Sequence, residues 1–215
     1  MDEQKQKRAL GILAREYAGA RPALHYKTAY ELLVAVILSA QCTDERVNKV
    51  TAELFKAYNT PAAMVTLPQE ELEKKIFSCG FYRNKAAHIL SASRDILEKF
   101  GGEVPENFED LCSLAGVGRK TANVVSSVWF RRDAIAVDTH VFRVSNRLGL
   151  AHASTPEKTE RDLMRAIPQK DWSDAHHWLI WHGRKVCHSQ KPDCAHCALS
   201  EVCDAFAEKA GKGKF

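Results

Sequence analysis

Signals that begin a helix recur along the whole chain and constrain its fold more than any other feature. Thr28 and Asp44 carry side chains that can cap a helix start, and proline follows Thr60, Leu67 and Thr155, where it can begin a helix. Between these signals, apolar residues recur at helical spacing. Neither an alternation of strands and helices nor an internal repeat interrupts the pattern. The sequence therefore predicts an all-α protein of about ten short helices.

The chain is long enough for one large domain or two modest ones, at 215 residues. Its net charge of +4 agrees with nucleic-acid binding without requiring it. The first eight residues are too polar for a secretory signal. The longest apolar run, Leu32 to Leu38, is far shorter than the ~20 residues of a membrane span. We therefore expect a cytoplasmic protein without a membrane segment.

A glycine turn precedes one of the expected helices. Gly116 and Gly118 stand two residues apart, before a helical pattern from about Thr121 to Trp129. Such a pair permits positive φ and close approach of another backbone, and the amides at the helix start can bind an anion. Lys120 lies in the first helical turn, where an exposed lysine without a function is the plain alternative. Asp138 precedes a later helical pattern, where a carboxylate can cap the helix.

Four of the seven cysteines crowd into residues 187–203 with the spacing C-x6-C-x2-C-x5-C. Structural disulfides are unusual in the cytosol, whereas four thiolates can bind zinc or a [4Fe–4S] cluster. Zinc sites usually pair two close couplets, and here one couplet has a single cysteine on each side, which favours the cluster. Three nearby histidines keep zinc as the alternative. The ligand set would be Cys187, Cys194, Cys197 and Cys203.

The glycine turn, Lys120, Asp138 and the cysteine spacing together resemble the endonuclease III family of the helix–hairpin–helix DNA glycosylase superfamily. The resemblance covers nearly the whole chain. It implies a six-helix barrel over residues 22–132, with the helix–hairpin–helix at about 108–130. It also implies a second helical domain, formed by residues 1–21 plus 133–215, that carries the [4Fe–4S] cluster. The two domains would flank a DNA-binding cleft.

The resemblance implies a base-excision-repair glycosylase with abasic-site lyase activity. Such an enzyme would act as a nucleoid-associated monomer on double-stranded DNA with damaged bases or abasic sites, and would remove oxidised pyrimidines. Lys120 would attack the sugar, since the helix dipole, Arg119 and partial burial all disfavour its charged form. The resulting Schiff base permits β-elimination. Asp138 would deprotonate the amine or stabilise positive charge on the sugar.

The resemblance also implies DNA contacts, because the target base must leave the stack. Gln41 matches the residue that fills the gap, and Phe81 occupies the place of an apolar wedge that is commonly leucine. His140 would line the site, pack in the domain or contact a phosphate. A monovalent cation is also expected at the hairpin carbonyls. The remaining expected contacts to DNA are Gly116, Val117, Gly118, Arg119 and Lys191, the last in the loop between two cysteines.

The sequence alone leaves three other functions open. A thymine- or uracil-mismatch glycosylase of the same fold would differ only in its base pocket. An iron–sulfur electron carrier would use the cluster, but it would have no need of the hairpin, Lys120 or Asp138. A non-catalytic DNA-binding module would keep the hairpin and would not cleave an abasic duplex.

Overall fold

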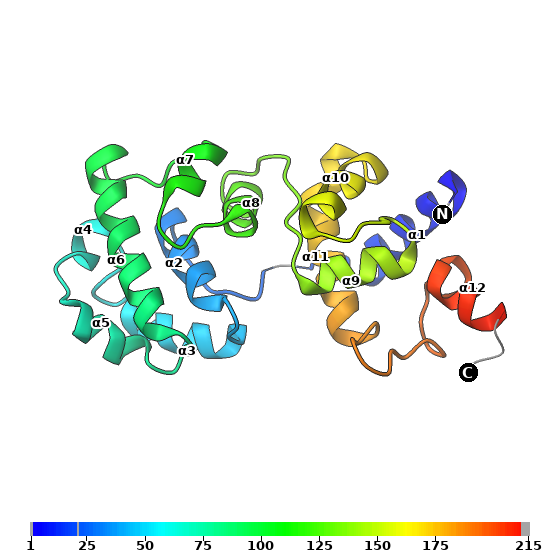
Figure 1. Ribbon diagram of the computed structural model, residues 1–215, viewed down its shortest axis with the longest axis horizontal. Helices are drawn as coiled ribbons and strands as arrows, with labels where there is room; N and C mark the ends of the chain where they lie inside the picture. Colours follow the sequence, from blue (N-terminus) through cyan, green and yellow to red (C-terminus); the bar gives the residue numbers. More distant parts are fainter. Residues whose placement is uncertain (1, 21, 212–215) are drawn as a thin grey trace. The chain divides into compact units, whose positions relative to one another are not determined.

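The computed structural model describes residues 2–20 and 22–211, in which helices are the only regular elements (Figure 1). This confirms the all-α prediction. The chain divides into two compact units, one formed by Pro22–Arg132 and the other by the described residues of Met1–Arg21 and Asp133–Phe215. No helix of the described chain combines the length and apolar character that a membrane crossing requires.

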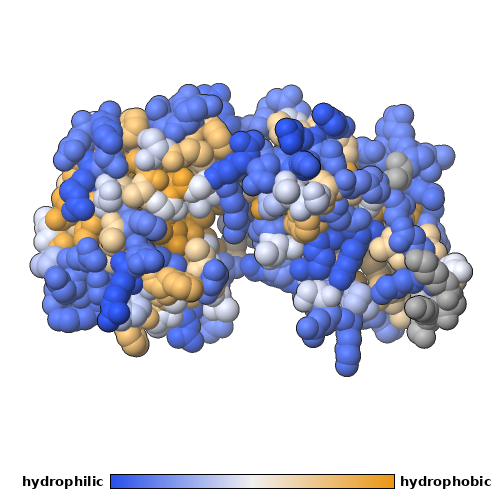
Figure 2. Space-filling model, viewed as in Figure 1, coloured by the Kyte–Doolittle hydropathy of each residue, from blue (hydrophilic) through white to orange (hydrophobic). Residues whose placement is uncertain are grey.

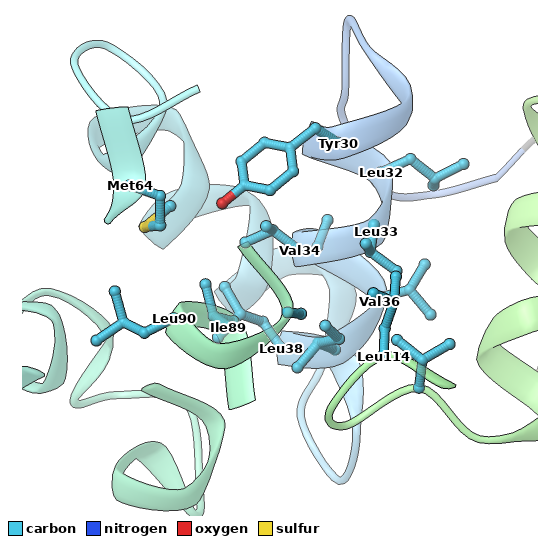
Figure 3. Packing of buried hydrophobic residues seen from close by; sticks show 14 of the residues in the cluster. Tyr30, Leu32, Leu33, Val34, Val36, Leu38, Met64, Ile89, Leu90 and Leu114 are labelled. Carbon is cyan, nitrogen blue, oxygen red and sulfur yellow. The ribbon is translucent and has the colours of Figure 1, made fainter. Parts of the chain in front are cut away.

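The Pro22–Arg132 unit is built around a helix that is buried on every side. The helix α2 follows the predicted cap Thr28, whose side chain accepts a hydrogen bond from Glu31 N–H at 3.1 Å. All residues from Tyr30 to Leu38 are buried, so burial covers every face of this helix. Side chains leave α2 in opposite directions, as Tyr30 and Leu32 do in Figure 3. The unit contains α2 (Ala29–Ser39), α3 (Asp44–Leu54), α4 (Pro61–Met64), α5 (Gln69–Ile76), α6 (Tyr82–Lys99), α7 (Phe108–Ser113) and α8 (Arg119–Val128).

The longest helix of this unit, α6, packs against α2, α4 and α5 (Figure 1). Apolar side chains also reach the surface of the unit in several places (Figure 2). Phe77 and Phe81 are its two most exposed large apolar residues, at 66% and 65%. They lie at the end of α5 and immediately before α6. The loop between these two helices therefore offers aromatic rings to solvent.

The other unit has a separate core. Leu13 of α1, Val141 of α9 and Leu179 of α11 are fully buried in it. α11 packs against α1 and α9, and α9 also contacts α10 and α12. The unit contains α1 (Glu3–Glu16), α9 (Thr139–Leu148), α10 (Pro156–Ala166), α11 (Trp172–Lys185) and α12 (Asp204–Gly211), with 3-10 turns η1 (Gln169–Asp171) and η2 (Ser200–Val202).

Candidate DNA-repair site

A tight turn joins α7 to α8. Val117 N–H donates to the carbonyl oxygen of Leu114 at 3.1 Å, and Gly116, the third residue of this turn, has φ +76°. This is the pattern of a type II turn, which requires positive φ at that position. A Cβ on Gly116 would lie 2.8 Å from Cβ of His88, so the close approach expected of the glycine is also present. Ala115 occupies the second position, where proline is common.

The second glycine of the turn has a different task. Gly118 has φ −89°, so positive φ is found only at Gly116 of the expected pair. It is the N-cap of α8, and it provides no side chain to accept from the amides of the first turn. No group of the described chain accepts a hydrogen bond from the N–H of Gly116 or Gly118. These amides can therefore receive an anion.

Val117, which lies between the two glycines, is part of the turn. Its N–H is used within the turn, and its side chain is 5% exposed and packs in the core. Because both groups are occupied, Val117 stabilises the turn. Arg119 is exposed, with its guanidinium 5.2 Å from the centre of the Phe108 ring. This contact joins the first residues of α7 and α8.

Lys120 occupies the second position of α8 and is exposed. The expected partial burial by the protein is therefore absent from the structure. The physical reason is its place at the helix start, because the buried residues of α8 begin only with Ala122. Its primary amine is accessible to a ligand from solvent.

Gln41 and Phe81 line one open cavity of about 330 Å³ together with Gly116. Gln41 follows α2 with φ +53°, and Phe81 precedes α6 with φ +55°. Left-handed backbone is uncommon for residues other than glycine and is concentrated at functional sites. The structure thus brings three of the expected DNA contacts together. The cavity is also lined by Ile37, Ala40, Asn84, Lys85 and His88.

Asp138 belongs to the other unit, where it caps α9. Its Oδ1 accepts a hydrogen bond from Val141 N–H at 2.7 Å, and its side chain is half-buried. His140 lies in the first turn of the same helix, and Arg143 donates to its Nδ1 at 3.1 Å. Burial lowers the pKa of His140, and the charges of Arg143 and Arg184 act in the same direction, whereas the Asp138 carboxylate acts against them. The lowered pKa favours the neutral imidazole, whose Nδ1 can accept this hydrogen bond.

Four cysteines line a single cavity of about 140 Å³ in the same unit. No three His, Cys, Asp or Glu side chains of the described chain converge closely enough to hold one metal ion. Four thiols that line one cavity are the usual ligand set of a [4Fe–4S] cluster. Arg147 donates to Sγ of Cys187 at 3.4 Å, which would offset part of the negative charge of such a cluster. The four cysteines and the neighbouring Arg147 therefore fit a [4Fe–4S] cluster.

Two arginines that the sequence analysis did not single out hold the loop that begins at Cys187. Arg143 donates to the carbonyls of Gly183 at 3.0 Å and of Cys187 at 3.1 Å. Arg147, four residues later on the same face of α9, donates to the carbonyls of His188 and Ser189 at 2.6 and 3.0 Å. The i, i+4 spacing was the available sequence signal. Farther along this loop, Lys191 is exposed with φ +49°.

The profile of the HhH-GPD superfamily of base excision DNA repair proteins matches residues 34–169. Endonuclease III from Synechocystis sp. is 50% identical over 202 residues, which are 94% of this chain and 92% of that protein. A solved structure of a trapped covalent intermediate between endonuclease III and DNA has a TM-score of 0.93 at 44% identity, covering 98% of this chain and 99% of that one. A thermostable thymine-DNA glycosylase shares the fold, with a TM-score of 0.83 at 24% identity and coverages of 95% and 98%. The chain therefore belongs to the HhH-GPD superfamily of base excision DNA repair proteins and, within it, to the endonuclease III family.

Proposed function

We propose that this chain excises oxidised pyrimidines from duplex DNA and cleaves the resulting abasic strand, with Lys120 as the nucleophile. The enzyme class, a base-excision-repair DNA glycosylase and abasic-site lyase, follows from membership of the endonuclease III family. The observation that supports Lys120 is its place directly after the hairpin. There an exposed amine stands beside the anion-binding amides of Gly116 and Gly118. A phosphate held by those amides would place the neighbouring deoxyribose near the amine.

The reaction is a substitution followed by an elimination. The neutral amine forms a bond to C1′, the C1′–N bond breaks, and the base leaves with its electron pair. Opening of the sugar ring gives a protonated Schiff base, which makes a proton on C2′ acidic. Loss of this proton breaks the C3′–O bond and releases the 3′ phosphate. Water then hydrolyses the imine and returns the amine of Lys120.

Asp138 is proposed to act through its carboxylate, as a base toward the attacking amine or as a negative charge opposite the developing cation on the sugar. Its Oδ1 is engaged with Val141 N–H, so Oδ2 is the atom assigned to this work. His140, whose pKa is lowered by burial, is assigned to the wall of the same site.

The proposal assigns the DNA grip to residues of several segments. Amides of Gly116 and Gly118 would hold a phosphate, and Arg119 and Lys191 would add positive charge near the backbone. Gln41 and Phe81 would enter the duplex where the base has left. We also assign a monovalent cation to the hairpin carbonyls. If the cation binds there, the affinity for DNA should fall when potassium is replaced by tetramethylammonium.

A [4Fe–4S] cluster is proposed to be held by Cys187, Cys194, Cys197 and Cys203, which line one cavity. When bound, the group supplies ordering of the surrounding loop, because the substitution and elimination require no electron transfer. Iron and acid-labile sulfide in about equal amounts, near four of each per chain, would support the cluster. Stoichiometric zinc without sulfide would contradict it.

The lesion range separates the proposal from the mismatch glycosylase of the same fold. A set of duplexes that each carry one oxidised pyrimidine, one uracil or one mismatched thymine would be assayed for base release and strand cleavage. Faster release of oxidised pyrimidines supports the proposal, and faster release of uracil or mismatched thymine favours the alternative. The thymine-DNA glycosylase resemblance, at 24% identity, supports a common fold and carries no information on the lesion.

The role of Lys120 is tested by trapping. Borohydride should reduce the Schiff base to a stable enzyme–DNA adduct, seen on a denaturing gel, and Lys120→Ala should lose this adduct. The fold should persist, because the residue is exposed and alanine favours helix. Lys56→Ala, at another exposed lysine, serves as the matched control and should trap normally. An adduct that survives in Lys120→Ala would place the nucleophile elsewhere.

A further inference from the structure

Three expected DNA contacts come from three separate segments, and α6 connects them. Phe81 is the N-cap of α6, Lys85 follows it by four residues, and His88 by seven, so all three share one helix face. They line the same cavity as Gln41 and Gly116. His88 contacts the hairpin, since a Cβ on Gly116 would meet it at 2.8 Å. Lys85 makes the corresponding connection to the Gln41 segment.

Lys85 is a buried cation. Only 5% of the residue is exposed, and its Nζ donates to the carbonyl oxygens of Leu38 at 2.8 Å and of Ala40 at 2.7 Å. These carbonyls belong to the C-terminal end of α2, where helix carbonyls have no partner within the helix and carry partial negative charge. A buried ammonium is costly unless hydrogen bonds satisfy it. The contact therefore caps α2 and satisfies Lys85 at once.

The capped carbonyls stand directly before Gln41. The backbone of Gln41 is left-handed, with φ +53°, a conformation that is strained for residues other than glycine. Such a conformation persists where neighbouring contacts determine it. Lys85 holds the peptide groups before Gln41, and Cys42 N–H closes the turn on Ser39 at 3.1 Å. A Cβ on Gly80 would lie 3.9 Å from the Gln41 carbonyl oxygen, so the Phe81 segment is adjacent.

We propose that Lys85 is a positioning residue for base extrusion, which holds Gln41 in the conformation that enters the gap in the duplex. The proposal rests on the proposed function and adds a residue that touches neither the sugar nor the lesion. Loss of Lys85 should therefore slow only the steps in which Gln41 fills a gap in the duplex. Steps on DNA without a complementary strand should not depend on it.

The test replaces the ammonium and keeps the apolar stem, as in Lys85→Met. Single-turnover excision from a lesion duplex should slow by roughly 10- to 100-fold, the loss expected from a misplacement of about 1 Å. Borohydride trapping on a single-stranded abasic oligonucleotide should stay within about two-fold of the parent. Lys99→Met, at an exposed lysine of the same helix, is the matched control and should excise normally. If Lys85→Met fails to fold, Lys85→Gln, which keeps two N–H donors, replaces it.

A double-mutant cycle distinguishes positioning from a general structural role. If Lys85 acts through Gln41, Lys85→Met should add less than about two-fold to the defect of Gln41→Ala. Independent, multiplying defects would overturn the inference, as would full excision by Lys85→Met. Loss of single-strand trapping in Lys85→Met would also contradict it. A parent enzyme that forms no adduct on any DNA would contradict the proposed function instead, so the two failures are distinguishable.

Discussion

At the scale of single residues, Asp138 combines a structural and a proposed chemical task in one carboxylate. One oxygen caps α9 through Val141 N–H, and the other is assigned to the sugar. Asparagine caps helices about as well as aspartate, whereas alanine does not. The two tasks can therefore be separated by the choice of substitution at this position.

Asp138→Asn should fold with nearly the parent stability and lose at least about 100-fold in single-turnover excision, because the charge that stabilises the transition state is gone. Asp138→Ala should lose the same activity and also about 1 kcal/mol of the free energy of unfolding. Urea unfolding and excision measured on the same preparations check both values. An active Asp138→Asn enzyme would remove the carboxylate from the mechanism.

At the scale of elements, the hairpin between α7 and α8 depends on its two glycines unequally. Gly116 has φ +76° and is packed against His88, whereas Gly118 has φ −89° with open space where a Cβ would stand. The first glycine is required by backbone conformation and by contact. The second is a helix cap with an accessible amide.

Gly116→Ala should therefore lower the free energy of unfolding by at least about 1–3 kcal/mol, since alanine is strained at positive φ and meets His88. Gly118→Ala should lose less than about 1 kcal/mol, the difference between glycine and alanine at an N-cap. Urea unfolding of the two variants measures this order. Equal losses would show that the turn has another conformation.

The same elements show what the sequence could predict. The predicted cap Thr28 accepts a backbone hydrogen bond as expected, whereas α3 is capped by Thr43, one residue before the predicted cap Asp44. Proline begins α4 and α10 as predicted, and both signals are local. The helix after the hairpin begins at Arg119, two residues before the predicted start, since Gly118 caps it without a side-chain signal. α12 was not predicted because none of its residues is buried, so it has no apolar periodicity to detect.

Other features depend on contacts between segments distant in the sequence. Lys85 follows an ordinary helical pattern, and nothing local distinguishes it from an exposed lysine. Its burial exists only because α6 lies against the end of α2. The left-handed backbone of Gln41 and Phe81 is likewise unmarked, since neither residue is glycine. The cysteine spacing and the hairpin glycines, by contrast, could be recognised in the sequence, because these residue types at these spacings indicate a specific local structure.

At the scale of the whole molecule, the two compact units have separate cores. The core that contains α2 and α6 is confined to Pro22–Arg132. Cys187, Cys197 and Cys203 pack against the other core, beside residues of α1, α9 and α11. The proposed cluster would therefore stabilise one unit directly, because metal binding that depends on folded ligands contributes to the free energy of folding.

Removal of the cluster should consequently loosen the unit that contains its ligands and spare the other. After iron is removed by chelation, with reductant present to keep the thiols free, amide hydrogen exchange should accelerate in α9, α11 and residues 187–203. Exchange in α2 and α6 should stay unchanged, since their core contains none of the ligands. Cys194→Ser provides a second route to the same state. Cys112→Ser, at a cysteine outside the cluster, is the matched control and should show parent exchange in both units.

Two outcomes would contradict this account. Equal acceleration in α2 and α9 would mean that the units unfold as one cooperative body, so that the free energy of cluster binding is shared across both cores. Unchanged exchange everywhere would mean that the arginine contacts to residues 183–189 hold the loop without the cluster. In that second case Arg147→Met, which removes the contacts to His188 and Ser189, should accelerate exchange in the loop even while iron is bound.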